Sequence, residues 1–403
     1  MPAWRKTVAA SLVSALALLA LVGSAPAEER SAFIEFSSAD LAELDIWEDS
    51  SFGPAGEIFY NRVDGLLVYM GMQYRSESQL HPRFEATWGW PSARSASYYQ
   101  LGVEQPVFDQ DSFSFGVDLS KRSAWSLEDD EAVSDLGNNL NAFFARIDDR
   151  DYFVQDGVTV FAQHRVNDRL RLRGEYRSHQ LESLRERESI WTVFQREDDW
   201  RENPALMRGV LKSAREFEGT LISTAWTVEY DSRDDEAMTG WWVRGVSEFG
   251  VNASGGDYDF RKHIVQAEKT FPISFTQTLD LSGTWGIGDG TTFPSHKLFH
   301  LGGRGNLRGY DHKEFAGKNM LFGRAEYNVR VNKSLTMVYF LESGQVGYTT
   351  SLPESDDSDG HKHDAGIGFR FGETDEGWIR LDVARAMEAE RDIKVYLSIF
   401  STH

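Results

Sequence analysis

The sequence predicts an all-β fold, a 16-stranded antiparallel transmembrane β-barrel, and three observations lead to this fold class. An export signal opens the chain, no long apolar segment follows it, and polar and apolar residues then alternate along most of its length. Strands cross a membrane as closed barrels, with outward side chains facing lipid and inward side chains facing water. The predicted location is therefore the outer membrane of a Gram-negative cell.

The first 27 residues have the layout of a cleaved secretory signal peptide. Arg5 and Lys6 form a basic start, residues 8–22 are an apolar run, and residues 25–27 read APA, an A-x-A cleavage site. The apolar run is short for a membrane-spanning helix, although an uncleaved N-terminal anchor is the alternative. The chain has no cysteine, which excludes a lipoprotein and any disulfide.

Composition favours a membrane barrel over a soluble enzyme or a nucleic-acid-binding protein. A mature chain of roughly 375 residues would correspond to two or three soluble domains, which would show continuous buried runs of valine, isoleucine and leucine. Here apolar residues are spread thinly, and aromatic residues make up 13% of the sequence. Loss of the signal, with two basic and no acidic residues, changes the formal net charge from −21 to −23. Such an acidic chain lacks the basic patches that nucleic acids need.

Alternation of apolar and polar side chains is the signal for individual strands, as in the segments 220–231, 274–285 and 324–331. In the last of these the odd positions are small, apolar or aromatic, and the even positions hold Arg324, Glu326, Asn328 and Arg330. Unpaired charges are costly in a dry protein core but are expected in a water-filled barrel. A soluble sandwich with one solvated face is the alternative interpretation.

Sixteen strands are predicted, the even number that a barrel with both ends on the periplasmic side requires. Their ranges are 56–75, 82–90, 98–107, 112–125, 139–147, 152–166, 169–181, 219–233, 240–251, 258–271, 273–287, 321–331, 335–348, 364–372, 377–388 and 392–400. The sequence thus divides into a signal peptide (1–27), a short acidic N-terminal extension (28–55) and the barrel (56–403). Because no internal repeat of fixed period occurs, a propeller or solenoid is disfavoured.

Three long connections fall outside the cell by this strand count: 182–218, 289–318 and 349–363. In the first of them, Trp191, Val193 and Phe194 are expected to pack as a small helical cap. The third is acidic, but its segment 356–364 fails EF-hand spacing, because Ser355 and Gly366 occupy positions that need Asp and Glu. We interpret it as a solvated loop, and His296, His300 and His312 as loop residues rather than metal ligands.

The second long connection contains a glycine-rich segment, 302–310, which reads GGRGNLRGY. It is not a dinucleotide loop, because Arg308 stands where G-x-G-x-x-G needs glycine. It is not a phosphate loop either, because His312 and Asn319 occupy positions that need glycine and Ser or Thr. No G-x-S-x-G nucleophile motif and no H-E-x-x-H zinc motif occurs. No enzyme activity, catalytic residue, metal or cofactor is therefore predicted.

The segment 307–310, LRGY, resembles the [V/L/I]RG[F/Y] motif of the BamA/TamA-type assembly and two-partner-secretion barrels, the bacterial surface antigen superfamily. The partner motifs of that family, G-x-x-E and F-x-D, are matched by GRAE at 323–326 and by FLE at 340–342, with Glu in place of Asp. The resemblance implies that the loop between strands 11 and 12 folds into the barrel and that Arg308, with Gly309 and Tyr310, is locked against Glu326 or Glu342. A guanidinium favours bidentate carboxylate partners, and alternation independently places Glu326 inward.

Two further motifs extend the resemblance over about residues 219–400. YDSRD at 230–234, with Gly240 six residues later, resembles a strand-turn signature of the family, and GIGFR at 366–370 with IRLD at 379–382 resembles its closing strands. The signature residues are Asp231, Arg233, Asp234, Gly240, Arg380 and Asp382. Family members tend to end on an aromatic residue, whereas here Phe400 is followed by three more residues.

The family also implies a role, which is assembly or translocation of proteins or lipids through a seam between the first and last strands. Its secreting and inserting members carry periplasmic POTRA domains. Only about 28 residues separate the cleavage site from Gly56, too few for one such domain. The expected partners are therefore outer-membrane lipid and a separate periplasmic or POTRA-bearing protein. A passive channel or structural barrel is the alternative from another class, and an outer-membrane lipase or protease is a third.

Overall fold

Sixteen strands of the computed structural model form one antiparallel sheet, in which strands adjacent in sequence are paired. The residues that the structure describes are 52–74, 81–108, 112–126, 133–194, 199–203, 217–233, 239–252, 255–347, 360–372, 378–388 and 391–400. The predicted signal peptide and residues 28–51 of the predicted extension lie outside them.

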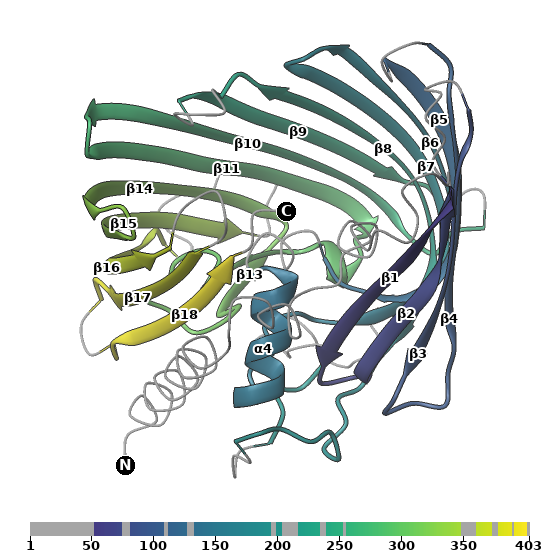
Figure 1. Cartoon of the computed structure of the whole chain (residues 1–403), viewed down its shortest axis with the longest axis horizontal. Helices are drawn as coiled ribbons and strands as arrows, with labels where there is room; N and C mark the ends of the chain where they lie inside the picture. The colour runs from purple at the N-terminus through teal and green to yellow at the C-terminus, as the bar shows by residue number, and fades with distance from the viewer. Residues whose placement is uncertain are drawn as a thin grey trace.

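The strands of the sheet follow one another in chain order, with one short hairpin inserted before β14 (Figure 1). They are β1 (Phe52–Asn61), β2 (Gly65–Tyr74), β3 (Arg83–Pro91), β4 (Tyr98–Pro106), β5 (Phe113–Ala124), β6 (Phe153–Asn167), β7 (Leu170–Ser183), β8 (Gly219–Asp231), β9 (Gly240–Gly250), β10 (Asp259–Ser274), β11 (Gln277–Thr292), β14 (Asn319–Asn332), β15 (Leu335–Gly347), β16 (Lys362–Phe371), β17 (Trp378–Ala386) and β18 (Lys394–Phe400). The predicted number of strands is confirmed.

The two-residue turns lie at one end of the sheet, and the three longest connections leave from the other end, where the β1–β2 turn of residues 62–64 also lies. Residues 168–169, 275–276 and 333–334 are two-residue turns. The connections after β5, β7 and β11 leave from the opposite end. They carry helix α4 (Asp135–Ala145) and the hairpin of β12 (Phe299–Leu301) and β13 (Phe315–Gly317). The two ends of the sheet therefore differ as the sequence predicts.

The predicted strand 56–75 is wrong, because this range holds the turn between β1 and β2. The side-chain oxygen of Asn61 accepts hydrogen bonds from the backbone N–H groups of Val63 and Asp64, at 3.0 and 2.7 Å. Gly65 follows with a φ of 69°. An asparagine that bonds its own turn and a glycine at positive φ reverse the chain, whereas the apolar residues on both sides read as one strand.

The predicted strand 139–147 is also wrong, because these residues belong to helix α4 and its C-terminal end. Ser134 caps the helix by accepting a hydrogen bond from Gly137 N–H at 3.1 Å, and Ala142 and Ala145 are buried on one side of it. A short run such as NAFFA fits either period, so its neighbours decide the structure. The two errors cancel, which is why the strand count holds.

The predicted helical cap of Trp191, Val193 and Phe194 forms no helix. The N–H groups of Val193 and Phe194 donate to the carbonyls of Phe143 and Phe144, at 3.0 and 3.1 Å. Trp191 packs edge-on against Phe143, with ring centroids 5.6 Å apart. These residues therefore pack onto α4 as an irregular segment.

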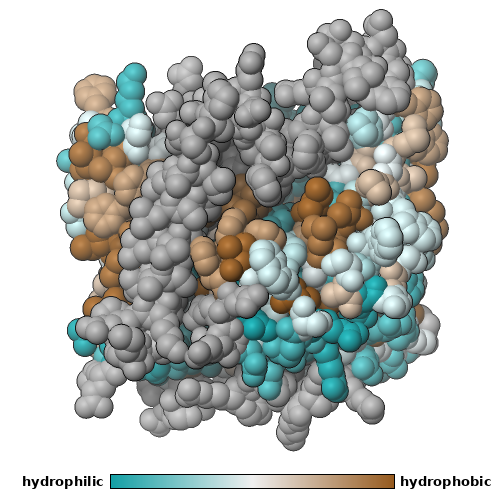
Figure 2. Space-filling model, turned by 60° about the horizontal axis from the view of Figure 1, so that its bottom comes forward, coloured by the Kyte–Doolittle hydropathy of each residue, from teal (hydrophilic) through white to brown (hydrophobic). Residues whose placement is uncertain are grey.

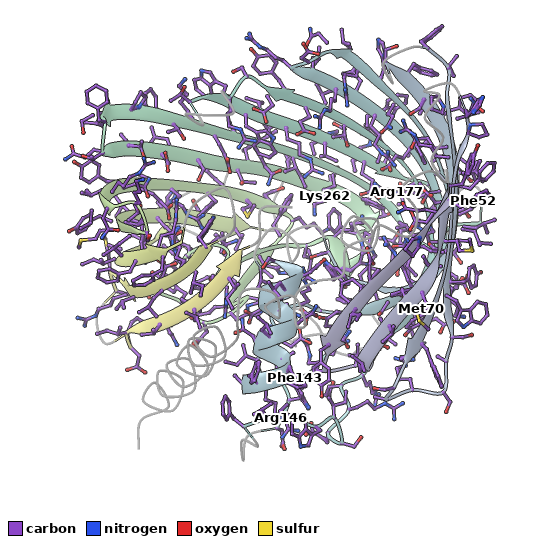
Figure 3. The ribbon with its side chains drawn as sticks, in the orientation of Figure 1. Phe52, Met70, Phe143, Arg146, Arg177 and Lys262 are labelled. Carbon is purple, nitrogen blue, oxygen red and sulfur yellow. The ribbon has the colours of Figure 1, made fainter. Side chains whose placement is uncertain are left out.

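Large apolar side chains on the outer face of the sheet are exposed, as a lipid-facing surface requires. Met70 is 67% exposed and Trp90 is 72% exposed. Figure 2 shows apolar side chains along both flanks of the molecule, with hydrophilic ones gathered towards one end. Figure 3 shows Met70 at the outside of the curved sheet and Arg177 and Lys262 within its curve. We call the concave side the inner face.

The sheet is curled but not closed. β1 and β18 lie at its two ends and, among the described residues, they pair only with β2 and β17. Helix α4 lies between them (Figure 1). None of the helices in the described ranges is long and apolar enough to cross a membrane.

Candidate functional site

The connection between β11 and β14 packs against the inner face of the sheet. A 3-10 turn, η4 (Ser295–Lys297), leads into β12, which pairs with β13 to form a hairpin. Leu307 and Tyr310, at the tip between them, are fully buried with Phe299, Leu301 and Phe322. Burial of such side chains is the main driving force that holds a loop down. The buried apolar residues of the loop therefore hold it against the inner face independently of its charged residues.

Glycine allows this loop to approach the sheet closely. Gly302 and Gly303 have φ values of 108° and 106°, which other residues rarely adopt. A Cβ atom on Gly309 would lie 2.3 Å from the backbone nitrogen of Ala386 in β17. The N–H of Gly309 donates to Asp364 Oδ2 at 2.7 Å. Only glycine fits at position 309 without a shift of the backbone.

Arg308 projects from this tip into a group of three carboxylates, which we call the arginine lock (Arg308, Glu326, Glu342 and Asp382). Its Nη2 lies 2.8 Å from Glu326 Oε1 and 3.0 Å from Glu342 Oε1, and its Nη1 lies 3.0 Å from Asp382 Oδ2. Its backbone N–H also donates to Glu342 Oε2 at 2.9 Å. The guanidinium carbon sits 3.5 Å from the ring centroid of Phe340. Both terminal nitrogens of the guanidinium and one face of its plane are therefore engaged.

The arginine lock is buried and balanced in charge by two more arginines. Arg380 Nη2 lies 2.7 Å from Glu326 Oε1, and Arg324 Nε lies 2.6 Å from Glu342 Oε1. Burial alone would lower the pKa of Arg308, but Glu342, Glu326 and Asp382 raise it above its ordinary value. Three guanidinium groups thus face three carboxylates, which is the arrangement that buried charges need.

The structure brings together seven of the sequence-predicted site residues at this lock. They are Arg308, Gly309, Tyr310, Glu326, Glu342, Arg380 and Asp382. Tyr310 contributes a hydroxyl that donates to the carbonyl of His363 at 3.2 Å, and its own carbonyl accepts from Tyr396. The tip is therefore bonded to β16 and β18 as well as to β15 and β17.

The other signature residues lie at the opposite end of the sheet, in the β8–β9 connection. Arg233 Nη2 lies 2.8 Å from Asp231 Oδ2. Gly240 begins β9 with a φ of 134°, and a Cβ there would lie 2.3 Å from the carbonyl oxygen of Ser232. Asp234 lies outside the described residues. This pair shapes a turn and does not touch the arginine lock.

Sequence reasoning missed that Asp382 and Phe340 are direct partners of Arg308. Both were available as signals, because Phe340 and Glu342, like Arg380 and Asp382, are two residues apart and share a strand face. Asp364 was also missed as the acceptor for Gly309. Cross-strand register places it opposite Glu342, on the same face.

No group of side chains that could hold a metal ion occurs among the described residues. Residues 356–359 of the acidic segment lie outside the described part of the chain. His296 is buried among Phe153, Phe217 and Tyr258, with ring centroids 5.1 to 6.2 Å away. Burial, with Lys297 close by, holds the pKa of His296 well below its ordinary value. It is therefore a neutral packing residue.

The inner face from β3 to β10 borders a cavity instead of a packed loop. Its volume is about 1010 Å³, and it is lined mainly by charged and polar side chains. Arg173 and Arg177 point into it from β7 and share Glu175, with Arg173 Nη2 2.9 Å from Glu175 Oε1. The half-exposed charges here contrast with the buried lock.

Comparison with known proteins identifies the family. A profile of the Omp85 superfamily domain matches residues 83–399. The chain belongs to the Omp85 superfamily. Its predicted resemblance to BamA/TamA-type barrels is thereby confirmed, and this Omp85 protein is an outer-membrane protein. A search of curated protein sequences gives no significant match.

Solved structures match this Omp85 protein at low sequence identity. BamA from Haemophilus ducreyi lacking POTRA domains 1–3 superposes with a TM-score of 0.58 at 13% identity, over 88% of this chain and 70% of that one. CdiB from Acinetobacter baumannii gives a TM-score of 0.46 at 10% identity, and CdiB from Escherichia coli gives 0.47 at 12%. Each CdiB match covers 87% of this chain, and the chain spans only 59% and 62% of theirs.

Proposed function

We propose that this Omp85 protein closes into a 16-stranded barrel in the outer membrane and assists assembly or translocation of protein or lipid cargo there. The seam between β1 and β18 is the working part. The β11–β14 loop folds into the lumen, and the arginine lock holds it there. The role is not enzymatic. The signal peptide, residues 1–27, and the acidic extension, residues 28–55, are part of the same proposal.

The observation that carries this proposal is the arginine lock. Buried charges are costly to desolvate, and their best-attested use is to specify one arrangement of the chain. Here they fix one loop against β14 to β17, the strands that lead to the unpaired edge of β18. A protein that opens and recloses a seam needs such a fixed support beside it.

The test is the envelope-protein profile of a strain without the gene, complemented with variants. We expect selective loss of particular outer-membrane proteins, rescued by the wild type and not by Arg308→Ala. Arg330→Ala is the matched control, because Arg330 lies on the inner face of the same strand as Glu326 and is exposed. An unchanged profile in the deletion strain would contradict the proposal.

A second candidate function, a passive channel, is favoured by the cavity of about 1010 Å³. Its polar lining is compatible with water and small solutes. Conductance in planar bilayers separates the two functions. A steady, solute-selective pore, together with an unchanged envelope-protein profile in the deletion strain, would favour the channel. The assembly function predicts a changed profile in that strain.

Partners follow from the same proposal. Cargo at the outer membrane has to be delivered across the periplasm, so we propose a separate periplasmic or POTRA-bearing protein as a partner. Co-purification from gently solubilised membranes tests it. Recovery of no periplasmic protein with the wild type, under conditions that recover lipid, would contradict this part.

A further inference from the structure

Helix α4 makes hydrogen bonds to both unpaired edges of the sheet. The carboxamide of Asn139 accepts from Tyr60 N–H at 2.9 Å and donates to the Ile58 carbonyl at 3.0 Å, both in β1. At the start of the helix, the hydroxyl of Ser134 donates to the Ile399 carbonyl in β18. The helix therefore joins two strands that are not paired with each other.

These contacts replace what a neighbouring strand would supply. An exposed sheet edge presents rows of unpaired N–H and C=O groups, and a covering helix is one way to protect it. The carboxamide of Asn139 offers one donor and one acceptor, as a peptide group does. It meets an N–H and a C=O on the same edge of β1. In a membrane protein, leaving such groups without partners is costly.

Apolar packing holds the far end of α4 against β1. The ring of Phe143 packs edge-on against Tyr60, with centroids 5.1 Å apart. The hydroxyl of Tyr60 donates to the Trp191 carbonyl. Figure 3 shows Phe143 and Arg146 at the lower end of α4. The helix is thus seated along its length and not by a single bond.

The segment that follows α4 is tied to the same loop that carries Arg308. Asp149 Oδ2 lies 3.2 Å from Arg304 Nε, and Asp151 Oδ2 lies 2.7 Å from Lys313 Nζ. Arg304 also donates to the Leu397 carbonyl of β18. Burial alone would raise the pKa of Asp151, but Lys313 and two arginines hold it well below its ordinary value. Asp151 is therefore ionised, and its pair with Lys313 is a buried ion pair.

The same segment is tied to the end of β1. Arg62, which is fully buried, places Nη2 2.8 Å from Asp151 Oδ1 and Nη1 3.3 Å from Asp148 Oδ1. Its backbone N–H donates to Asp148 Oδ2 at 3.0 Å. One carboxylate, Asp151, thus links the β1 turn to Lys313 of the loop.

We propose that α4 is a removable seal of the β1–β18 seam and that the β11–β14 loop holds it in place through Arg304 and Lys313. This inference rests on the proposed function of the seam. When these two ion pairs break, the segment after α4 is released and the helix leaves the two edges, while the arginine lock keeps the tip of the loop in place. The groups it uncovers are backbone donors and acceptors. Their matching occupant is an extended polypeptide strand, which lipid cannot replace.

The structural test is hydrogen exchange of the full chain refolded into phosphatidylcholine vesicles. Asn139→Leu removes both bonds to β1, so we expect the β1 peptide to exchange about tenfold faster. Lys313→Gln is expected to speed exchange in β1 as well, although residue 313 lies in neither α4 nor β1. Asn141→Leu is the matched control, because the described contacts give its side chain no hydrogen bond to either edge.

Two results would overturn this inference. Unchanged exchange in β1 with Asn139→Leu would show that α4 does not seal the edge. Acceleration with Asn139→Leu but not with Lys313→Gln or Arg304→Gln would show that the loop does not hold the helix. Neither result depends on whether the protein assembles cargo, so failure here is distinct from failure of the proposed function.

The functional test uses the absence of cysteine from the chain. In the double variant Tyr60→Cys and Phe143→Cys, a short reducible cross-linker tethers α4 to β1. We expect insertion of an outer-membrane protein into the same vesicles to stop on cross-linking and to return on reduction. Full activity of the tethered protein would overturn the seal. Each single variant, treated with the same reagent, controls for the substitutions.

Discussion

The two halves of the sheet carry the same alternation on their inner faces but have different surroundings. From β14 to β17 the loop covers the inner face, and the arginines and carboxylates there are buried in close pairs. From β3 to β10 the inner face borders the cavity, where side chains such as Arg122 and Arg171 are exposed. The same sequence pattern thus produces a dry cluster and a wet wall.

The difference lies in what covers the charges. The side chain of Arg308 is 3% exposed, whereas that of Arg173, also beside a glutamate, is 35% exposed. Solvent screens an exposed ion pair, and its net contribution to stability is small. Removing one partner of a buried pair leaves the other charge without compensation, which is strongly destabilising. Removing a charged side chain should therefore lower the stability more in the half from β14 to β17 than in the half that borders the cavity.

Arg308→Ala is the largest expected effect and the most direct test of this contrast. It leaves Glu326, Glu342 and Asp382 facing one another with one guanidinium fewer. We expect a loss of about 3–5 kcal/mol in the free energy of unfolding. Urea unfolding of the protein in vesicles, followed by the circular dichroism of the sheet, measures it. Arg308→Lys should recover only part, because lysine keeps the charge but not the fork.

The control is Arg330→Ala, on the inner face of β14 but exposed. Its effect should stay within about 0.5 kcal/mol, as for surface substitutions in general. Equal losses of unfolding free energy for the two variants would mean that burial under the loop does not strengthen the ion pairs. This result would contradict the proposed difference between the two halves.

Much of the lock could be predicted from the sequence. Alternation assigned Glu326 inward, and the resemblance of segment 307–310 to the family motif implied that Arg308 meets it. Spacing placed Asp382 on the same strand face as Arg380, but it did not show that the loop tip reaches β17. How deeply Leu307 and Tyr310 are buried decides which strands the tip contacts. Loop packing is a tertiary property that strand periodicity does not encode.

The helix at the seam could not be predicted in the same way. Residues 139–147 fit a strand as well as a helix, and only Ser134 gave a capping signal for the helix. That Asn139 meets β1 depends on how far the β5–β6 connection folds back across the opening. A single side chain offering a peptide-like donor and acceptor leaves no periodic trace in the sequence.

Gly309→Ala is the next largest expected effect, and it sharpens the contrast without touching a charge. The added methyl would lie 2.3 Å from Ala386 N, so the loop must lift away from β17. We expect a loss of about 1–3 kcal/mol, measured as for Arg308→Ala. Gly245→Ala in β9 is the matched control, since nothing lies within 4 Å of its Cβ position. Equal stability of the Gly309→Ala and Gly245→Ala variants would show that the loop is not packed tightly against β17.

A pH dependence follows from His296 at the base of the loop. Burial first, and then Lys297 and Lys262, hold its pKa well below the ordinary value, while Glu248 acts in the opposite direction. The unfolded chain binds a proton below about pH 6.5 and the folded one does not, so stability falls as pH decreases. Between pH 6.5 and 5.5 the expected loss is about 1 kcal/mol.

His296→Gln is the control for this titration. Its own stability is expected to be lower at pH 7.5, but the part of the pH dependence due to position 296 should vanish. Urea midpoints of both proteins at pH 7.5, 6.5 and 5.5 provide the measurement. If stability depends on pH equally in the variant and the wild type, another group is responsible for the titration. His296 at the base of the loop would then not contribute to the pH dependence of stability.

Apart from the control variants, Arg173→Gln in the cavity wall has the smallest expected effect on stability, about 1 kcal/mol or less. Its guanidinium is bonded to Glu175 and Gln163 but keeps contact with the cavity. If ions pass along this wall, loss of the cation should shift the reversal potential in a salt gradient away from anions, while Arg308→Ala, remote from the cavity, should shift it less. A loss of stability as large as that of Arg308→Ala would break the comparison, because the wet wall would then be as tightly coupled as the dry cluster.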